Sequence, residues 1–216
     1  MTNFFKNNKW KIFISSLVTV LPVLAGIVLW DRLPDMMPTH WGIDGNADAE
    51  SSKAFAVFGL PIILLAIHLL CCFATSLDKR GREQSNAILS VVMLIVPLMS
   101  LCVNGVIYAS SLGAVIDVSV FVIIILGVLF VLIGNYLPKV RQNRIIGVRI
   151  IWTLKNEDNW YATHRFAGKI WFFGGILAIA TAFLPTVIKA VAFFSIVAVL
   201  GIAPIVYSWC YSIKHR

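Results

Sequence analysis

The chain has 216 residues, of which 59% are hydrophobic and only 13% are charged, and its formal net charge is +8. Soluble domains carry about 25% charged residues, so this composition excludes an ordinary soluble protein and indicates a polytopic membrane protein. A positive net charge can also point to nucleic acid. Here, however, the basic residues gather in the segments between apolar blocks, a placement typical of membrane topology, and we expect no direct binding of nucleic acid.

Six apolar blocks are long enough, or nearly so, to cross a bilayer, whose hydrocarbon core of about 30 Å needs about 20 residues of helix. They cover residues 12–30, 55–77, 87–110, 117–137, 168–185 and 188–211. Only a tight break at Pro185 separates the last two. The sequence therefore predicts an all-α membrane protein in which residues 1–216 form a single transmembrane domain, a bundle of about six helices.

The Lys and Arg residues predict the orientation of this bundle, because cytoplasmic loops are enriched in both. Of the eighteen, only Arg32, Lys53 and Lys189 fall on one side. The other fifteen are Lys6, Lys9, Lys11, Lys79, Arg80, Arg82, Lys139, Arg141, Arg144, Arg149, Lys155, Arg165, Lys169, Lys214 and Arg216. We therefore expect both termini and residues 138–167 in the cytoplasm, an even number of spans, and a multi-pass protein of the cell membrane.

The predicted extracytoplasmic loop, residues 31–54, is acidic. It carries Asp31, Asp35, Asp44, Asp48 and Glu50 against two basic residues. Its apolar residues are too few for an independent fold, so we expect it to pack as a cap over the outer helix ends. Its candidate ligand- or partner-binding residues are Pro38, His40, Trp41 and Asp44. Spacing alone also allows a plainer interpretation, in which Trp41 is an interfacial anchor beside a histidine.

Residues 134–171 form the most distinctive stretch, with seven Lys or Arg, three Trp and one His between two apolar blocks. Gly127 and Gly134 lie one heptad apart and would let another helix approach closely. Arg149 stands in an apolar run, so we expect it to reach a headgroup phosphate, a helix C-terminus or one of the carboxylates of Asp78, Glu157 and Asp158.

A helix is predicted to begin near Glu157, capped by Thr153 or Asn156, and to continue into the fifth span. Trp160, His164 and Gly168 then recur every four residues on one face. Residues 134–171 are called the inner segment below. Its candidate binding residues are Asn135, Pro138, Asn143, Gly147, Arg149, Trp152, Thr153, Trp160, His164 and Arg165. A basic, Trp-bearing stretch can also serve only to bind anionic lipid.

Catalysis has little support in the sequence, which contains no HExxH, GxSxG or phosphate-binding glycine loop. An enzyme would have to use His164 as general base, with no evident nucleophile or carboxylate beside it. No cofactor or metal site is expected, since the four cysteines lie in apolar runs without ligand spacing. His68, inside an apolar block, is expected to bond to a neighbouring helix.

Two signatures resemble known bacterial membrane proteins. Leu33-Pro34, Pro38, His40-Trp41, Gly45 and Lys53 resemble an N-terminal module of uncharacterised function. The second is similar to the signature of the SdpI family: Gly134-Asn135, Pro138-Lys139, Asn143, Gly147-Val148-Arg149, Trp152-Thr153-Leu154, Trp160, Thr163-His164-Arg165, Gly168 and Trp171. The chain departs from that signature at Ile150-Ile151, where the family commonly has Thr-Pro.

The resemblance implies six spans and an immunity function, in which the protein protects its cell from a secreted toxic peptide. It also implies a signalling role, in which a transcriptional repressor is held at the membrane while toxin is present. The expected partners are thus membrane lipids, a toxin peptide outside and a repressor inside. The alternative function is a lipid- or small-molecule-binding membrane transporter, or an envelope-stress protein.

Overall fold

The computed structural model describes residues 2–215, so Arg216, counted above among the basic residues of the carboxyl terminus, lies outside the described residues. The chain forms two compact units. The amino-terminal unit comprises Met1–Ser76 and Leu89–Ser119, and the carboxyl-terminal unit comprises Leu77–Ile88 and Val120–Arg216. Each unit has its own helices and its own polar contacts, and each is described by itself.

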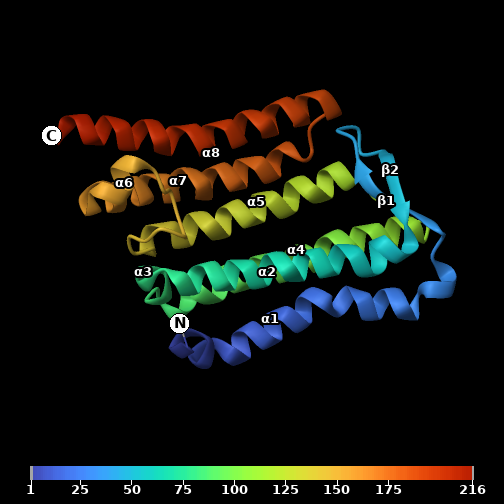
Figure 1. Cartoon of the computed structure of the whole chain (residues 1–216). Helices are drawn as coiled ribbons and strands as arrows, with labels where there is room; N and C mark the ends of the chain where they lie inside the picture. The colour runs from blue at the N-terminus through green and yellow to red at the C-terminus, as the bar shows by residue number, and fades with distance from the viewer. Residues whose placement is uncertain (1, 216) are drawn as a thin grey trace. The chain divides into compact units, whose positions relative to one another are not determined.

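The amino-terminal unit is built from three long helices and a hairpin (Figure 1). In chain order, its elements are α1 (Thr2–Val28), η1 (Trp30–Arg32), β1 (Met36–Trp41), β2 (Ala47–Ser52), the π-helical turn η2 (Phe55–Gly59), α2 (Leu60–Leu77) and α4 (Asn86–Ser111). Leu33 and Met37 lie in a buried cluster with Val57 of η2 and with Ile107 of α4. The segment between α1 and α2 is therefore packed against the ends of the helices.

Polar side chains join the three long helices of this unit. Ser15 Oγ of α1 and His68 Nε2 of α2 lie 2.8 Å apart, and both side chains are buried. Ser100 Oγ of α4 donates to the carbonyl oxygen of Thr19 at 2.7 Å. A polar group in an apolar interior is costly unless it is hydrogen-bonded, so these contacts help to specify how the helices pack. The expectation that His68 bonds to a neighbouring helix is confirmed.

The hairpin is a feature that the sequence analysis did not predict. β1 and β2 are antiparallel, with Met37 opposite Ser51 and Pro38 opposite Glu50, and the register shifts at His40. A tight turn at Asp44-Gly45 closes it, since Gly45 has a φ of 81°, a conformation that costs glycine little. The loop therefore gains backbone pairing of its own in addition to its packing against the helices.

The carboxyl-terminal unit consists of α3 (Lys79–Arg82), α5 (Val118–Tyr136), η3 (Leu137–Lys139), α6 (Ile151–Lys155), α7 (Glu157–Thr181) and α8 (Thr186–Lys214). Glycines bring α5 and α7 together, as predicted for Gly127 and Gly134. A Cβ on Gly134 would lie 2.4 Å from the backbone nitrogen of Phe172, and one on Gly127 would lie 2.9 Å from the carbonyl oxygen of Gly175. The two helices thus pack backbone to backbone.

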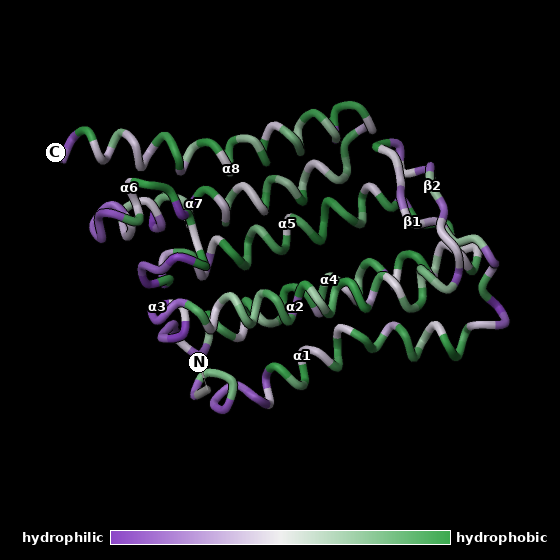
Figure 2. Tube along the Cα trace, in the orientation of Figure 1, coloured by the Kyte–Doolittle hydropathy of each residue, from purple (hydrophilic) through white to green (hydrophobic). Residues whose placement is uncertain are grey.

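Five helical stretches of the described chain are long and apolar enough to cross a membrane: Asn3–Val28, Phe55–Leu77, Asn86–Ser111, Val118–Lys139 and Thr186–Lys214. The expected count of six is therefore approximate. The predicted fifth span, residues 168–185, falls largely in α7, which does not join this group because the same helix also carries the polar residues from Glu157 to Lys169. Figure 2 shows this change from hydrophilic to hydrophobic along α7.

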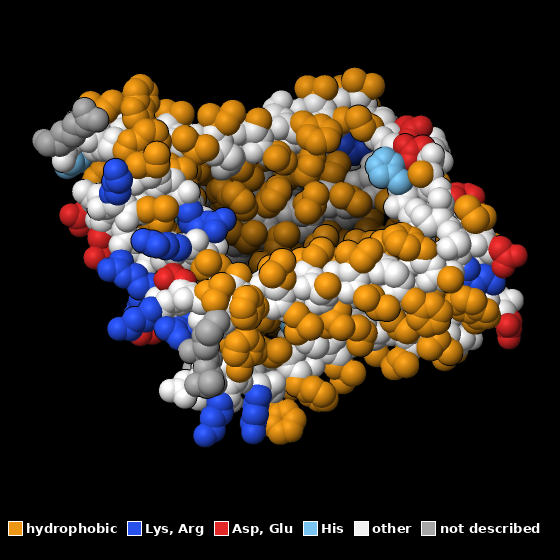
Figure 3. All heavy atoms as spheres, in the orientation of Figure 1, with side chains coloured by type: hydrophobic (Ala, Val, Ile, Leu, Met, Phe, Trp, Pro, Cys, Tyr) orange, Lys and Arg blue, Asp and Glu red, His pale blue; other side chains and the backbone are white. Residues whose placement is uncertain are grey.

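Large hydrophobic side chains lie exposed along the long helices, as Figure 3 shows on one face of the molecule. They include Leu17 and Leu24 of α1, Leu70 of α2, and Val191 and Ile202 of α8. Exposed apolar surface on this scale is stable in lipid and not in water. The all-α membrane bundle is confirmed, and the chain is a multi-pass protein of the cell membrane.

Candidate functional site

The inner segment between α5 and α7 is an ordered loop built around Asn143. The Asn143 Oδ1 accepts hydrogen bonds from the backbone N–H groups of Ile145 (2.8 Å) and Ile146 (2.6 Å). Its amide nitrogen donates to the carbonyl oxygens of Arg141 and Ile146. One buried amide side chain thus replaces the backbone pairing that a helix or sheet would supply, which is the ordinary role of Asn in turns.

Gly147, Trp160 and His164 hold the middle of this loop against α7. The His164 Nε2 accepts a hydrogen bond from the backbone N–H of Val148 at 3.1 Å, and Nδ1 donates to the carbonyl oxygen of Trp160 at 2.8 Å. The rings of Trp160 and His164 are stacked, with their centroids 3.9 Å apart. Gly147 has a φ of 110°, and a Cβ there would lie 2.3 Å from His164 Nε2. Only glycine fits this position.

His164 is fully buried, and burial lowers the pKa of its imidazole to about 4. Both ring nitrogens are already bonded to the backbone, which requires the neutral ring with its proton on Nδ1. A general base needs an accessible lone pair, and this histidine has none. His164 therefore holds the loop and is not placed for proton transfer.

The side chains of Thr153 and Trp160 make further hydrogen bonds to the backbone of the loop. The Thr153 hydroxyl donates to the carbonyl oxygen of Val148 at 2.8 Å and accepts the N–H of Ile150 at 3.1 Å. The indole N–H of Trp160 donates to the carbonyl oxygen of Val140 at 2.8 Å. Both side chains are fully buried. Asn156, one of the two predicted caps, accepts the N–H of Asn159 and begins α7.

Polar residues that sequence reasoning did not select connect the loop to α3. The side chain of Gln84 pairs with the backbone of Arg141 in both directions, at 2.9 and 3.0 Å. The Asp78 carboxylate accepts the N–H of Gly81, which caps α3, and the N–H of Arg144 at 3.0 Å. Gln142 accepts from Arg80 and donates to the carbonyl oxygen of Thr153. Of Asp78, Gln84 and Gln142, the sequence analysis named only Asp78, as one of three candidate carboxylate partners of Arg149.

The remaining predicted residues of the inner segment lie at or near its surface. Arg149 is exposed, and its Nη1 donates to the carbonyl oxygen of Arg144 at 3.0 Å. Of the three kinds of partner predicted for Arg149, the carboxylate is not the one observed, since Asp78 bonds to the backbone of Arg144 instead. Asn135 and Arg165 are exposed and Trp152 is half-buried. The Pro138 ring faces Gly168, where an added Cβ would meet it at 2.5 Å.

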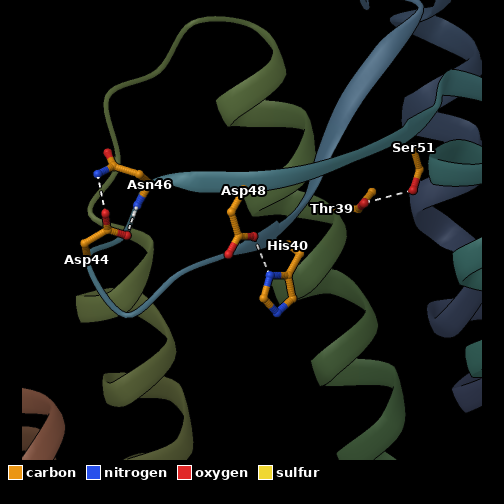
Figure 4. Close-up of polar contacts among 6 residues, drawn as sticks. All are labelled: Thr39, His40, Asp44, Asn46, Asp48 and Ser51. Carbon is orange, nitrogen blue, oxygen red and sulfur yellow. Dashed lines mark hydrogen bonds and ion pairs between the residues drawn. The ribbon is translucent and has the colours of Figure 1, made fainter.

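The hairpin presents a second, separate group of predicted residues (Figure 4). The Nδ1 of His40 and a carboxylate oxygen of Asp48 lie 2.5 Å apart, and both side chains are largely exposed. Trp41 is half-buried and packs against the cluster that contains Met37. Pro38 pairs with Glu50 across the strands. His40 is therefore the exposed member of this group, bonded to Asp48, and Trp41 is a packing residue.

Asp44 shapes the turn of the hairpin. Its two carboxylate oxygens accept hydrogen bonds from the side chain of Asn46 at 2.8 Å and from the N–H of Asn46 at 3.1 Å. These bonds lower the pKa of Asp44 below its ordinary value, and the bond from the Asn46 side chain has the larger effect. Lys53, at the base of the hairpin, lies 3.2 Å from an oxygen of Asp35 and donates to the carbonyl oxygen of Trp30.

Comparisons with known proteins match both signatures. Residues 139–208 match the model of the SdpI/YfhL protein family, and residues 17–65 match a domain of unknown function, DUF1648. The chain is 27% identical over 174 residues to a Bacillus subtilis (strain 168) protein described as "Immunity protein SdpI", an alignment that covers 80% of this chain and 82% of that protein. No solved structure matches. The order and extent of these matches confirm the predicted resemblance to the SdpI/YfhL family.

Proposed function

We propose that this protein protects its cell from a secreted antibacterial peptide and signals the presence of that peptide to a transcriptional repressor. The observation that carries the proposal is the similarity to an immunity protein along 80% of the chain. Its two family matches, residues 17–65 and 139–208, contain the hairpin and most of the inner loop.

The hairpin is the surface that would meet the peptide. The acidic side chains of Asp44, Asp48 and Glu50 are exposed, while the nearest cation, Lys53, is already paired with Asp35. A surface of one sign attracts partners of the opposite sign and raises their association rate. The predicted orientation places it outside the cell, so a cationic or amphipathic peptide is the partner that this surface favours.

The inner loop is the surface that would meet the repressor. Its interior is fixed by the bonds of Asn143, Thr153 and His164, so its exposed residues are held on an ordered backbone. Those exposed residues include the basic Arg141, Arg144 and Arg149. An ordered basic surface suits an acidic patch on a protein partner.

The test is survival of a toxin-sensitive bacterial strain that expresses the chain and is challenged with the family's toxic peptide. We expect protection by the wild-type protein. Glu50→Lys, which reverses one exposed charge on the hairpin, should lower the tolerated peptide concentration by roughly tenfold, equivalent to about 1.4 kcal/mol of binding. The matched control is Glu83→Lys, which reverses an exposed glutamate in the loop that contains α3.

Both variants must be present in the membrane in wild-type amounts, and a carboxyl-terminal reporter must show unchanged orientation. Equal loss of protection in the two variants would argue against capture by the hairpin.

A second arm follows a fluorescent fusion of a repressor encoded beside the gene. Arg149→Glu should abolish its toxin-dependent membrane recruitment without lowering survival, and recruitment that persists in this variant would contradict the role of the inner loop.

A further inference from the structure

The carboxyl-terminal unit contains a cavity of about 390 Å³ that the function proposed above does not use. It is formed by η3, α7 and α8, and six residues line it: Pro138, Ala162, Arg165, Phe166, Lys169 and Tyr207. Two of these are cations, none is an acid, and the remainder are apolar or aromatic. A ligand that fits this lining must be anionic in one part and apolar in another.

The two cations are placed to act on one group. Arg165 and Lys169 are four residues apart on α7 and therefore project from the same face of the helix. Both side chains are exposed. Within residues 2–215, neither Arg165 nor Lys169 forms an ion pair with a carboxylate. Their charges are available to a ligand.

The apolar wall is rigid. The rings of Phe166 and Tyr207 are stacked with centroids 4.4 Å apart and an angle of 8° between their planes, which joins α7 to α8. Pro138 is held on the other side by its close contact with Gly168. A wall of stacked rings loses little side-chain entropy when a ligand lies against it, so the site is preorganised.

The position of the cavity along α7 indicates the kind of ligand. Lys169 is the last charged residue of the helix, and residues 170–181 carry none. The cavity thus lies where the polar beginning of α7 gives way to its apolar part. In a membrane protein this boundary lies at the level of the lipid headgroups, where basic side chains meet anionic phosphate. A free phosphate would use the cations but not the aromatic wall.

We propose that this cavity binds the headgroup of an anionic phospholipid. The phosphate lies between Arg165 and Lys169, and the glycerol and first acyl carbons lie along Phe166 and Tyr207. Arg and Lys together give a phosphate both a directional donor pair and a point charge. This inference is independent of toxin immunity, because it rests on the cavity alone.

The test measures thermal unfolding of the purified full-length protein in detergent with added phosphatidylglycerol, phosphatidylcholine or inorganic phosphate. Phosphatidylglycerol should raise the unfolding temperature of the wild-type protein more than the other two. The double variant Arg165→Gln/Lys169→Gln should lose this difference, with an apparent affinity for phosphatidylglycerol lowered at least tenfold, equivalent to about 1.4 kcal/mol. Native mass spectrometry should show one retained phosphatidylglycerol in the wild type and none in the double variant.

The matched control is Arg144→Gln/Lys155→Gln, which removes two exposed cations of the same unit outside the cavity. It should bind phosphatidylglycerol as the wild type does. Equal loss in both double variants would show a general effect of charge and overturn the proposal. Equal stabilisation by inorganic phosphate would assign the site to a free anion, and equal stabilisation by phosphatidylcholine would remove the role of headgroup charge. Unfolding temperatures without lipid check that both variants are folded.

Discussion

At the residue scale, His164 makes the stability of the inner loop depend on pH. The neutral ring accepts the N–H of Val148, and its pKa of about 4 lies below the ordinary value of 6.5. The imidazole of His164 therefore takes up a proton less readily in the folded protein than in the unfolded chain. Stability is fully present above about pH 6.5 and is lost as pH falls towards 4, by up to about 3 kcal/mol.

We expect the unfolding temperature in detergent to fall between pH 6.5 and 4.5 more steeply for the wild type than for His164→Gln. A glutamine can still accept from Val148 but has no proton to gain. His215→Gln is the control, because His215 is exposed and bonds only to the carbonyl oxygen of Tyr211. Parallel pH profiles for wild type and His164→Gln would refute this assignment.

At the element scale, the contact between α5 and α7 depends on glycine. An Ala at Gly134 would place its Cβ 2.4 Å from the backbone of Phe172 and 2.8 Å from the carbonyl oxygen of Gly168, so the helices would have to separate. We expect Gly134→Ala to destabilise the protein by about 1–3 kcal/mol, the usual cost of overpacking. The measurement is unfolding by denaturing detergent.

The control for this substitution is Gly105→Ala, a helical position in α4 where an added Cβ meets nothing within 4 Å. That variant should unfold like the wild type or slightly later, since Ala is a better helix former than Gly. Equal destabilisation by the two substitutions would show that the backbone contact between α5 and α7 is not what matters at Gly134.

The elements also show which parts of the fold are predictable from sequence. The start of α7 follows from local rules, because Asn156 caps it and acids occupy its first turn. The hairpin does not, because β2 has the sequence ADAESS, in which alanines are the only apolar residues and the β-branched and aromatic residues typical of a strand are absent. It is ordered instead by pairing with β1 and by the packing of Leu33 and Met37 with Ile107, which is a long-range effect.

In the candidate site, too, contacts within one segment are more predictable from sequence than contacts to residues far along the chain. The signature residues Asn143, Gly147 and His164 belong to one short segment and come together in the inner loop. The backbone groups of Arg141 and Arg144 in the same loop instead bond to Gln84 and Asp78, which lie 57 and 66 residues away along the chain. No spacing rule connects a carboxylate to a backbone N–H at that separation, so the attachment of α3 to the loop could not be predicted.

At the scale of the whole molecule, the distribution of charge predicts how α7 lies. Both tails are expected in the cytoplasm, which requires an even number of spans. Since five other helices are long and apolar enough to cross, α7 must supply the sixth crossing with the apolar residues after Lys169. Residues 182–185, between α7 and α8, should then face outward.

Reporter insertions check this topology. A fluorescent protein that folds only in the cytoplasm should be bright at the carboxyl terminus and dark after Leu184, and a reporter active only outside should give the opposite result. The insertion after Gly45, in the hairpin turn, serves as the outward reference. A bright cytoplasmic reporter after Leu184 would mean that α7 does not cross the membrane and that the tails lie on opposite sides.

The loop that contains α3 has a consequence for how this chain can be divided or recombined. Residues 77–88 belong to the carboxyl-terminal unit, although the chain enters them from α2 and leaves them through α4, most of which belongs to the other unit. A cut at residue 119 would therefore leave Asp78 and Gln84 on the wrong fragment, and the backbone of Arg141 and Arg144 would lose its partners. The two compact units are built from segments that alternate along the chain, so a chimaera that exchanges the carboxyl-terminal unit for that of a homologue must also exchange residues 77–88.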